Sequence, residues 1–292
     1  MASETRNCIG QSTDREQSGM TTTSEKAPSP EPRSGVVPVN GLDLYYEIHG
    51  RGDPLVLLHG AMGTIDACFA DLIPILAASH MVVAVELQGH GHTGDVVDRA
   101  LSYEQLAADV AGLMRSLGIG SADVVGYSLG GGVAVQLAIS EPRLTRRIVF
   151  AGGASYRRDG LQPDMLEGSD SDVPDLTGTP WHEAYVKVAP HTEQWNNLVA
   201  KNVDLDSHFE GWTADQVRSV QAPVLLIIGD ADIVRPEHTV EMFRLLGGGV
   251  NGDVTGLSRS RLAVLPGTTH IGVLGRVDWL GPMILDFLGE EL

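Results

Sequence analysis

Residues 122–132 of the 292-residue chain read ADVVGYSLGGG, and this segment gives the clearest indication of the fold. Its first part, ADVV, is a short apolar run, which predicts a strand buried on both faces. The glycines around Ser128 predict a tight reversal of the chain, because a Cβ atom there would collide with the adjoining strand or helix. Residues 129–139 then show helical spacing. The sequence therefore predicts a strand, a sharp turn and a helix in direct succession.

The regions on either side repeat this pattern. Apolar runs, each about the length of one buried strand, cover residues 54–60, 81–86, 147–153, 222–230 and 261–267. Helical spacing is found over residues 64–78, 103–117, 236–246 and 271–288. Apolar strands that alternate with helices indicate an α/β fold, in which helices cover both faces of a mainly parallel sheet.

The beginning of the chain departs from this alternation. Residues 1–35 are rich in Ser, Thr, Glu and Pro and poor in large apolar side chains, so we expect a disordered tail. From Val36 the residues alternate between apolar and polar, which predicts a β-hairpin. Asn40 and Gly41 would supply the positive φ angles of its turn.

A second departure lies in the middle of the chain. Residues 155–220 contain no apolar strand-like run. The first part is acidic and rich in Gly and Pro, and the second part has the spacing of amphipathic helices. We therefore expect an inserted cap or lid on one core domain, which residues 36–154 and 221–292 would form.

The composition excludes several classes of protein. With 42% hydrophobic and 20% charged residues, the chain can bury a sizeable core. A net charge of −18 disfavours binding to nucleic acid or to anionic membranes. Cys8 and Cys68 fit neither a disulfide framework nor a cysteine-rich metal site. Because an apolar run of bilayer length and a secretory signal are both missing, we expect a cytoplasmic protein. The sequence leaves homo-oligomerisation open.

Ser128 is the candidate nucleophile. It stands in the pattern G-x-S-x-G, between a predicted strand and a predicted helix, which is the context that this motif requires. A serine hydroxyl is a weak nucleophile at neutral pH, so it needs a base, and the base needs an acid that orients it. His270 is the best candidate base among the ten histidines, because it follows the last predicted strand and so lies at the same sheet edge.

The orienting acid should also follow a strand. The stretch LLIIGDADIVRP, residues 225–236, offers Asp230 and Asp232 at such a place. The spacing G-x-x-D-x-x-x-P favours Asp232, whereas Asp230 would make hydrogen bonds in the turn. Asp159, which follows the strand predicted at residues 147–153, is a rival position for the acid.

An anionic intermediate needs backbone donors. The loop after the strand at residues 54–60 begins with His59 and Gly60, and we predict that the N–H groups of Ala61 and Leu129 form the oxyanion hole. His59 is expected to pack this loop rather than to act as a base, because one base is sufficient.

These residues together resemble the α/β-hydrolase superfamily, from about Val36 to the end of the chain. The order Ser128, Asp232, His270 is the nucleophile–acid–base order of that family. The resemblance implies an α/β-hydrolase fold, a cap formed by residues 155–220 and a Ser-His-Asp triad that uses no cofactor.

One motif differs from the family's pattern. Many members carry Asp-x-Arg-Gly-x-Gly-x-Ser after the next strand, whereas residues 86–93 read ELQGHGHT here. Gln88 replaces the arginine, so a charged clamp at this position is not expected. His90 and His92 are interpreted as parts of the loop structure and not as metal ligands, because a metal site needs three or four converging ligands.

The type of nucleophile narrows the expected reaction. Haloalkane dehalogenases and epoxide hydrolases of this fold use an aspartate at the turn, so Ser128 disfavours both. We expect hydrolysis of a small, neutral carboxylic ester through an acyl-enzyme. Hydrolysis of a carbon–carbon bond in a diketone, cofactor-free perhydrolysis and a receptor-like role in which the pocket only binds a ligand remain open.

Substrate contacts are expected from residues near the turn and from the aromatic residues of the insertion. The candidates are Met62, Tyr127, Trp181, Trp195 and Trp212. The alternative is that the aromatic side chains only pack the insertion onto the core. Five basic and twelve acidic residues between positions 155 and 220 give a balance of −7, which predicts a preference for neutral over anionic esters.

Overall fold

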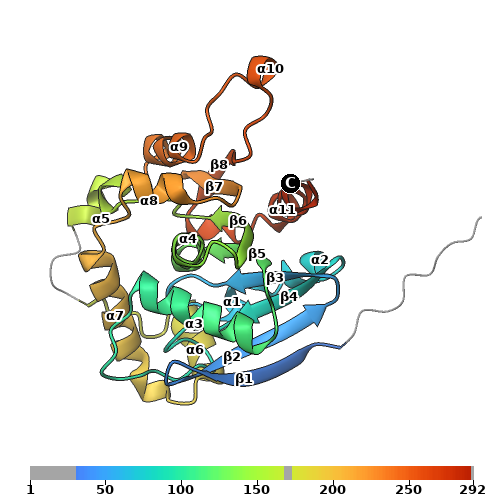
Figure 1. Ribbon diagram of the computed structural model, residues 1–292. Helices are drawn as coiled ribbons and strands as arrows, with labels where there is room; N and C mark the ends of the chain where they lie inside the picture. Colours follow the sequence, from blue (N-terminus) through green and yellow to red (C-terminus); the bar gives the residue numbers. More distant parts are fainter. Residues whose placement is uncertain (1–30, 168–172, 291–292) are drawn as a thin grey trace, which may run out of the picture.

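The computed structural model describes residues 31–167 and 173–290 (Figure 1), so residues 1–30 of the predicted tail lie outside the described residues. The described residues form one eight-stranded sheet with the order β1-β2-β4-β3-β5-β6-β7-β8. The strands are β1 (Arg33–Val39), β2 (Leu42–Gly50), β3 (Asp53–Leu58), β4 (His80–Val85), β5 (Ala122–Tyr127), β6 (Thr145–Ala151), β7 (Val224–Ala231) and β8 (Arg261–Thr269).

Strand directions divide the sheet into two parts. The hairpin of β1 and β2 is antiparallel, and β2 also pairs antiparallel with β4. All other neighbouring strands are parallel. The hairpin turn has positive φ angles at Asn40 (49°) and Gly41 (80°). The mainly parallel α/β-hydrolase sheet predicted from the sequence is thus confirmed.

Helices cover both faces of this sheet. The helices are α1 (Ile65–Phe69), α2 (Ile73–Leu76), α3 (Tyr103–Ser116), α4 (Leu129–Ser140), α5 (Pro163–Glu167), α6 (Pro180–Val188), α7 (Trp195–His208), α8 (Ala214–Ser219), α9 (Pro236–Leu245), α10 (Gly252–Thr255) and α11 (Val277–Gly289), with short 3₁₀ turns η1 (Arg158–Gly160), η2 (Thr192–Gln194) and η3 (Ile271–Val273).

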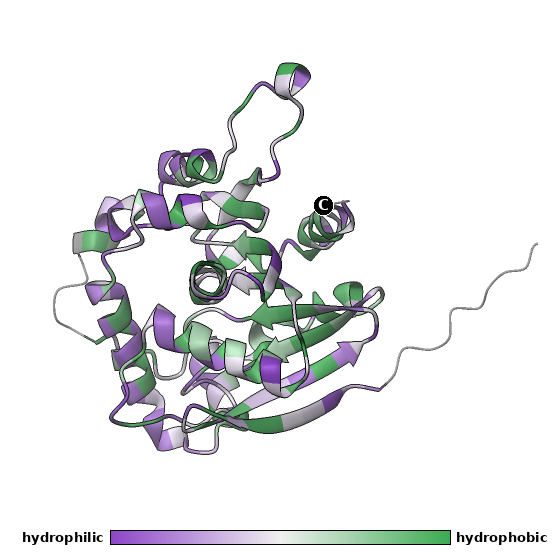
Figure 2. Cartoon of the chain, in the orientation of Figure 1, coloured by the Kyte–Doolittle hydropathy of each residue, from purple (hydrophilic) through white to green (hydrophobic). Residues whose placement is uncertain are grey.

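The two faces of the sheet have separate cores. On one face, α3, α4, α8 and α9 pack on strand residues such as Val56 and Val124. On the other face, α1, α2 and α11 pack on the intervening residues, such as Leu57 and Val125. Successive strand residues point to opposite faces, and both faces are covered, so the central strands are apolar throughout (Figure 2).

Three predicted boundaries differ from the structure. Residues 33–35, which we assigned to the tail, form the start of β1. The helix predicted over residues 64–78 is divided into α1 and α2, because Pro74 has no N–H to continue the hydrogen bonding of α1. The helix predicted over residues 271–288 begins as η3 and becomes α-helical only at Val277.

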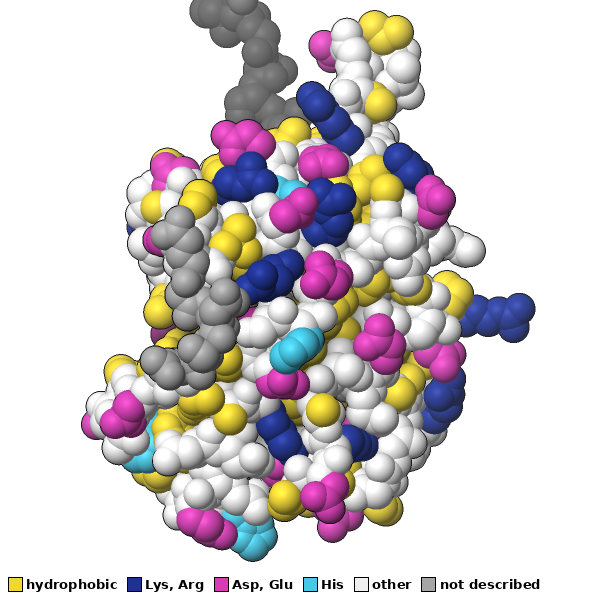
Figure 3. Space-filling view, turned by 90° about the vertical axis from the view of Figure 1, so that its left-hand side faces the viewer, with side chains coloured by type: hydrophobic (Ala, Val, Ile, Leu, Met, Phe, Trp, Pro, Cys, Tyr) yellow, Lys and Arg dark blue, Asp and Glu magenta, His cyan; other side chains and the backbone are white. Residues whose placement is uncertain are grey.

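Between β6 and β7, the chain forms a set of helices that we call the helical insertion, using the predicted bounds 155–220. Its described elements are η1, α5, α6, η2, α7 and α8. The face shown in Figure 3 lies on the side of the molecule where α5 and α7 are found. Acidic and basic side chains are interspersed on it, so the negative balance of the insertion forms no patch of a single sign there.

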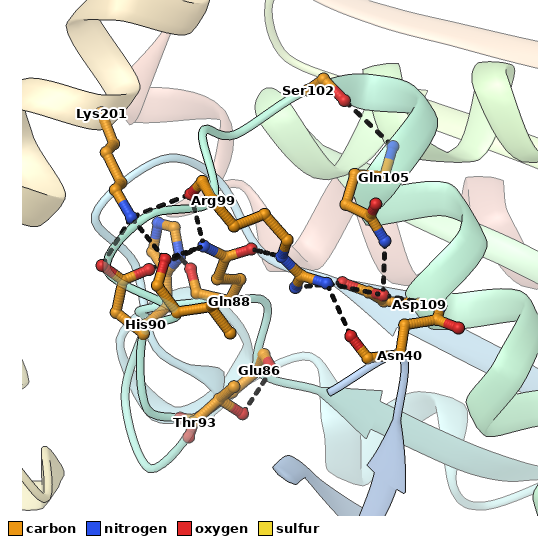
Figure 4. Close-up of polar contacts among 12 residues, drawn as sticks. Asn40, Glu86, Gln88, His90, Thr93, Arg99, Ser102, Gln105, Asp109 and Lys201 are labelled. Carbon is orange, nitrogen blue, oxygen red and sulfur yellow. Dashed lines mark hydrogen bonds and ion pairs between the residues drawn. The ribbon is translucent and has the colours of Figure 1, made fainter. Parts of the chain in front are cut away.

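A buried polar network joins α7 to the core (Figure 4). Lys201 on α7 contacts Asp95 at 2.7 Å and donates to the carbonyl groups of Val96 and Arg99, both at 2.9 Å. Gln88 donates to Asp95 at 2.7 Å and accepts from the Arg99 side chain at 2.6 Å. The neutral Gln88 therefore connects the Lys201–Asp95 pair to Arg99, which pairs with Asp109. As expected for an uncharged side chain, it does not act as a charged clamp.

The same network continues to the edge of the sheet. The Arg99 guanidinium pairs with Asp109 on α3 at 2.7 Å, and Asp109 also accepts from Asn40 in the hairpin turn and from Gln105. The network thus ties together the insertion, the loop after β4, α3 and the turn between β1 and β2. None of the helices in the described ranges has the length and apolar character needed to cross a bilayer.

Candidate active site

Ser128 lies in a strained turn between β5 and α4. Its backbone has φ 52° and ψ −116°, a conformation that residues with a Cβ atom rarely adopt. A Cβ added at Gly126 would lie 2.2 Å from the carbonyl oxygen of Gly130, and one at Gly130 would lie 2.1 Å from that of Leu58. Both glycines of the motif are therefore required by close packing of backbone against backbone.

Three side chains from three strand ends meet at this turn. His270 Nε2 lies 3.0 Å from Ser128 Oγ, and His270 Nδ1 lies 2.9 Å from Asp232 Oδ1. Ser128 follows β5, Asp232 follows β7 and His270 follows β8. These strands are parallel, so their carboxyl ends lie at one edge of the sheet. The three residues that the sequence singled out are thus in one hydrogen-bonded chain.

Asp232 is held in its ionised form. Its carboxylate accepts from the backbone N–H of Ile233 at 2.8 Å and of Gly153 at 3.2 Å. Burial by itself would raise the pKa of this carboxyl group, but the hydrogen bond and charge of His270, with backbone donors that include the N–H of Gly229, lower the pKa overall. A negative charge at this place favours the tautomer of His270 that carries its proton on Nδ1.

The two rival acids make other contacts. Asp230 accepts a hydrogen bond from the backbone N–H of Thr268 at 3.1 Å, which is a turn contact of the kind expected for it. Asp159 is exposed and pairs with Arg157 at the surface. Neither carboxylate contacts His270 in the described part of the chain, where Asp232 is its carboxylate partner.

Tyr127 supports the histidine. Its ring stacks on the imidazole of His270 with centroids 5.3 Å apart, and its hydroxyl donates to the backbone carbonyl of His270 at 3.2 Å. Tyr127 is buried, and it also lies against Gly60 and Gly152. The residue therefore fixes the position of the imidazole, and it does not line the cavity in which Ser128 lies.

The loop after β3 lies beside Ser128. A Cβ added at Gly60 would be 3.3 Å from the Cβ of Ser128, and Met62 adopts φ 58° in the same loop. Ala61 and Leu129 line the cavity together with Ser128. The two residues predicted to donate to the oxyanion thus line the cavity with the serine, and Leu129 is the first residue of α4, where free N–H groups favour an anion.

His59 is a structural residue of this loop. The buried ring donates from Nδ1 to the carbonyl of Gly60 at 2.8 Å and accepts at Nε2 from the N–H of Leu87 at 3.0 Å. Burial, with the nearby ring of His90, lowers the pKa of His59 to about 3, so the imidazole is neutral. Both ring nitrogens are engaged, which leaves none for catalysis.

Ser128 opens into a cavity of about 390 Å³ between the core and the helical insertion. Most of its lining is apolar. The core provides Ala61, Tyr103, Leu129 and Phe150, and the insertion provides Leu161, Met165, Val203, Phe209 and Trp212. A cavity of this size and character suits a small, largely apolar substrate.

Of the five predicted substrate contacts, only Trp212 lines this cavity. Trp195 is buried against Tyr185 in a separate cluster within the insertion, and Met62 and Trp181 pack against that cluster. For Trp181 and Trp195 the structure therefore agrees with the alternative interpretation, in which the aromatic side chains pack the insertion. Tyr103 and Phe150 were missed because their places on α3 and β6 gave no signal of a cavity.

Metal ligands are not clustered in the described ranges: no three His, Cys, Asp or Glu side chains there are placed to hold an ion. His92 donates from Nδ1 to the buried carboxylate of Glu86 at 2.8 Å and stacks on Tyr45. His90 is buried and bonded to the carbonyl of Gln88. Both histidines of this loop thus hold its structure, as expected.

Comparison with known proteins agrees with this architecture. The sequence profile of the family described as the alpha/beta hydrolase fold matches residues 53–181. A protein of Azorhizobium caulinodans assigned as the carbamate hydrolase RutD is 26% identical, over 85% of this chain and 96% of its own length. The 2-hydroxymuconate semialdehyde hydrolase of Pseudomonas sp. strain CF600 is 33% identical, over 42% of each chain.

Solved structures show the same fold. The meta-cleavage product hydrolase CumD of Pseudomonas fluorescens superposes with a TM-score of 0.66 at 20% identity, over 87% of this chain and 96% of that one. The carboxylesterase CesB of Bacillus subtilis superposes with a TM-score of 0.66 at 18% identity, over 90% and 93% of the two chains. At this level of identity the likeness concerns the fold alone.

Proposed function

We propose that this chain, whose residues 53–181 match the profile of the alpha/beta hydrolase fold, is a serine hydrolase of small carboxylic esters with Ser128, His270 and Asp232 as its catalytic triad. The observation that carries the proposal is the unbroken chain of contacts from Ser128 Oγ to His270 (3.0 Å) and from His270 to Asp232 (2.9 Å), opening into an apolar cavity.

The first half of the reaction is acylation. Ser128 Oγ attacks the ester carbonyl while His270 Nε2 takes its proton, and the charge of Asp232 stabilises the imidazolium that forms. The carbonyl oxygen becomes negative in the tetrahedral intermediate, and the N–H groups of Ala61 and Leu129 bind it. Each such donor contributes about 3–4 kcal/mol to the stability of the transition state. His270 then protonates the departing alcohol.

The second half is deacylation. Water enters the place that the alcohol has left, and His270 removes a proton from it as it attacks the acyl-enzyme. The intermediate collapses, Ser128 regains its proton from the imidazole, and the carboxylic acid leaves. The helical insertion acts as a cap that limits access to the cavity and shapes the part of the substrate that it accepts.

A second candidate is hydrolysis of a carbon–carbon bond in a diketone with the same triad. It is favoured by similarity to the 2-hydroxymuconate semialdehyde hydrolase, which is 33% identical over 42% of this chain. The full-length similarity to a protein assigned as a carbamate hydrolase makes a carbamate a further substrate to test.

Both candidates are tested with one panel of substrates. The panel contains nitrophenyl esters of increasing acyl length, one carbamate and one vinylogous diketone. We expect Ser128→Ala to lower kcat for esters by roughly 10⁴- to 10⁶-fold without loss of folded protein. Ser140→Ala is the control, because that hydroxyl bonds to the carbonyl of Gln136 on α4.

The outcomes are distinct. Wild-type ester hydrolysis by Ser128→Ala would overturn the assignment of the nucleophile. A diketone turned over far faster than every ester, and still dependent on Ser128, would replace the proposed reaction with the second candidate.

A further inference from the structure

One face of α7 points into the cavity that holds Ser128. Val203, Asp206 and Ser207 all line it, and their spacing of three and four residues places them on the same side of the helix. Asp204 lies on the other side, where its exposed carboxylate pairs with His208. Asp206 therefore brings a carboxylate to the wall of an otherwise mostly apolar cavity.

The carboxylate of Asp206 lacks a hydrogen-bond donor in the described ranges of the chain. The nearby Arg158 donates from Nε at 3.2 Å, but to the backbone carbonyl of Asp206 and not to its side chain. Its charge acts on the carboxylate at longer range. Asp206 is exposed and lines the cavity, so its side chain is accessible from there.

The other charged groups of the cavity wall are engaged. Arg157 makes two hydrogen bonds to Asp159. The carboxylate of Asp164 accepts from the N–H of Met165 at 3.1 Å. Asp206 differs from these groups, since its oxygens keep their capacity to accept hydrogen bonds from whatever enters the cavity.

The environment of Asp206 disfavours a bare negative charge. Desolvation raises the pKa of Asp206 to about 6, against the opposing effects of His270 and Arg158. Asp206 and Ser128 line the same cavity, so the carboxylate faces the space in which a substrate would meet the triad. Asp206 is exposed toward the cavity, and a ligand that fills the cavity would displace water from its carboxylate, so the ligand must donate a hydrogen bond there to offset that loss.

We propose that Asp206 is a specificity-determining residue that binds a hydrogen-bond donor of the substrate, either a hydroxyl group or a protonated amine, on the part that faces the helical insertion. The inference rests on the proposed function, because it assigns the substrate class of the same site. The preferred ester thus carries a donor beyond its apolar portion, and a purely alkyl ester of the same length binds less well.

The test measures binding to the Ser128→Ala protein by calorimetry, so that hydrolysis does not enter. The probes are phenyl esters of hexanoic, 6-hydroxyhexanoic and 6-aminohexanoic acid, and acetate esters of hexanol, hexanediol and 6-aminohexanol. The two series place the donor on the acyl side and on the alcohol side. Each is measured with Asp206 intact, with Asp206→Asn and with Asp206→Leu.

We expect the hydroxyl- or amino-bearing member of one series to bind about 10- to 100-fold more tightly than its alkyl counterpart when Asp206 is present. Asp206→Leu should remove this advantage and leave the binding of the alkyl ester unchanged or improved. Asp206→Asn should retain part of it for the hydroxyl, because the amide oxygen still accepts, and lose it for the amine. A gain limited to the amine identifies a cationic substrate.

Asp204→Asn is the matched control, because it removes a carboxylate from the solvent side of the same helix. Equal binding of alkyl, hydroxyl and amino probes in both series, or a preference that survives Asp206→Leu, would overturn the proposal. Donor-dependent binding in a protein that hydrolyses no ester with Ser128 intact would instead refute the proposed function and leave the role of Asp206 standing.

Discussion

Among single residues, the glycines on either side of Ser128 are essential to the site, because a side chain at either position would prevent the close backbone contacts of the turn. Ser128 adopts a positive φ angle that costs about 1–3 kcal/mol, and this strain persists only because the surroundings enforce it. Gly126 and Gly130 permit the close backbone contacts that hold the turn. The resulting conformation exposes the hydroxyl at the sheet edge.

Gly126→Ala should therefore destabilise the protein by about 2–4 kcal/mol and lower ester hydrolysis, because its Cβ would lie 2.2 Å from a backbone oxygen. Gly120→Ala is the control, since no atom lies within 4 Å of a Cβ at that position. Urea unfolding measures both. Two variants of equal stability would show that the turn can relax.

Asp232→Asn should lower kcat by roughly 10⁴-fold, because a neutral amide no longer selects the correct tautomer of His270. The lowered pKa of Asp232 also predicts an effect on stability. The ionised carboxylate stabilises the fold above its unfolded pKa of about 4, and this contribution is lost as the pH falls through the lower folded value.

The free energy of unfolding should thus be about 1–3 kcal/mol higher for the wild type than for Asp232→Asn at pH 7. The difference should shrink below about pH 4, where the wild-type carboxylate becomes protonated. Chemical unfolding over this pH range measures it, and a difference that grows toward acid would contradict the assignment.

At the scale of elements, the position of α7 determines the shape of the cavity. Lys201 joins this helix to Asp95 and to two carbonyl groups of the loop after β4. Lys201 is 13% exposed and Asp95 is 4% exposed, so both charges are largely withdrawn from water. The contacts therefore set the register of α7 against the core, and with it the positions of Val203 and Asp206.

Lys201→Met should destabilise the protein by about 3 kcal/mol or more, since it leaves the buried charge of Asp95 without its cationic partner. We also expect KM for esters to rise more than kcat falls, because the cavity wall shifts while the triad stays in place. Lys187→Met, on the exposed side of α6, is the control. A lower kcat at unchanged KM would contradict a positioning role.

At the scale of the whole molecule, strand order brings distant residues together. Ser128 and His270 are 142 positions apart, yet the parallel strands β5 to β8 place their carboxyl ends along one edge. The insertion follows the carboxyl end of β6, so it begins at that edge beside the triad, and α8 leads the chain back to the amino end of β7. Insertion residues line the cavity that holds Ser128, so a substrate that entered this cavity would meet the negative balance of the insertion.

This charge distribution predicts a dependence on salt. For matched neutral and anionic esters, kcat/KM should favour the neutral ester several-fold at about 10 mM salt, and the preference should decline toward about 0.5 M as charges are screened. Acidic and basic groups are interspersed on the face in Figure 3, so the effect is a long-range one. Equal kcat/KM values at low salt would contradict it.

The order of strands and helices along the chain, the turn at Ser128 and the candidates Asp232 and His270 could all be predicted from the amino-acid sequence. These are local properties: apolar periodicity sets buried strands, and a glycine pattern sets a turn. The break near Pro74 was not predicted, because the helical spacing of apolar residues continues on both sides of this proline.

The set of side chains that forms the cavity, in contrast, depends on how the elements pack and could not be predicted from the sequence. Trp195 and Trp212 look alike in the sequence, yet one is buried inside the insertion and the other lines the cavity with Tyr103 and Phe150 from the core. Asp204 and Asp206 are two residues apart, about 200° around the helix, so Asp206 lines the cavity whereas Asp204 pairs with His208 on the other side. Such differences depend on the contacts between helices and strands that are far apart in the sequence. The periodicity of apolar residues along one helix or strand does not predict those contacts.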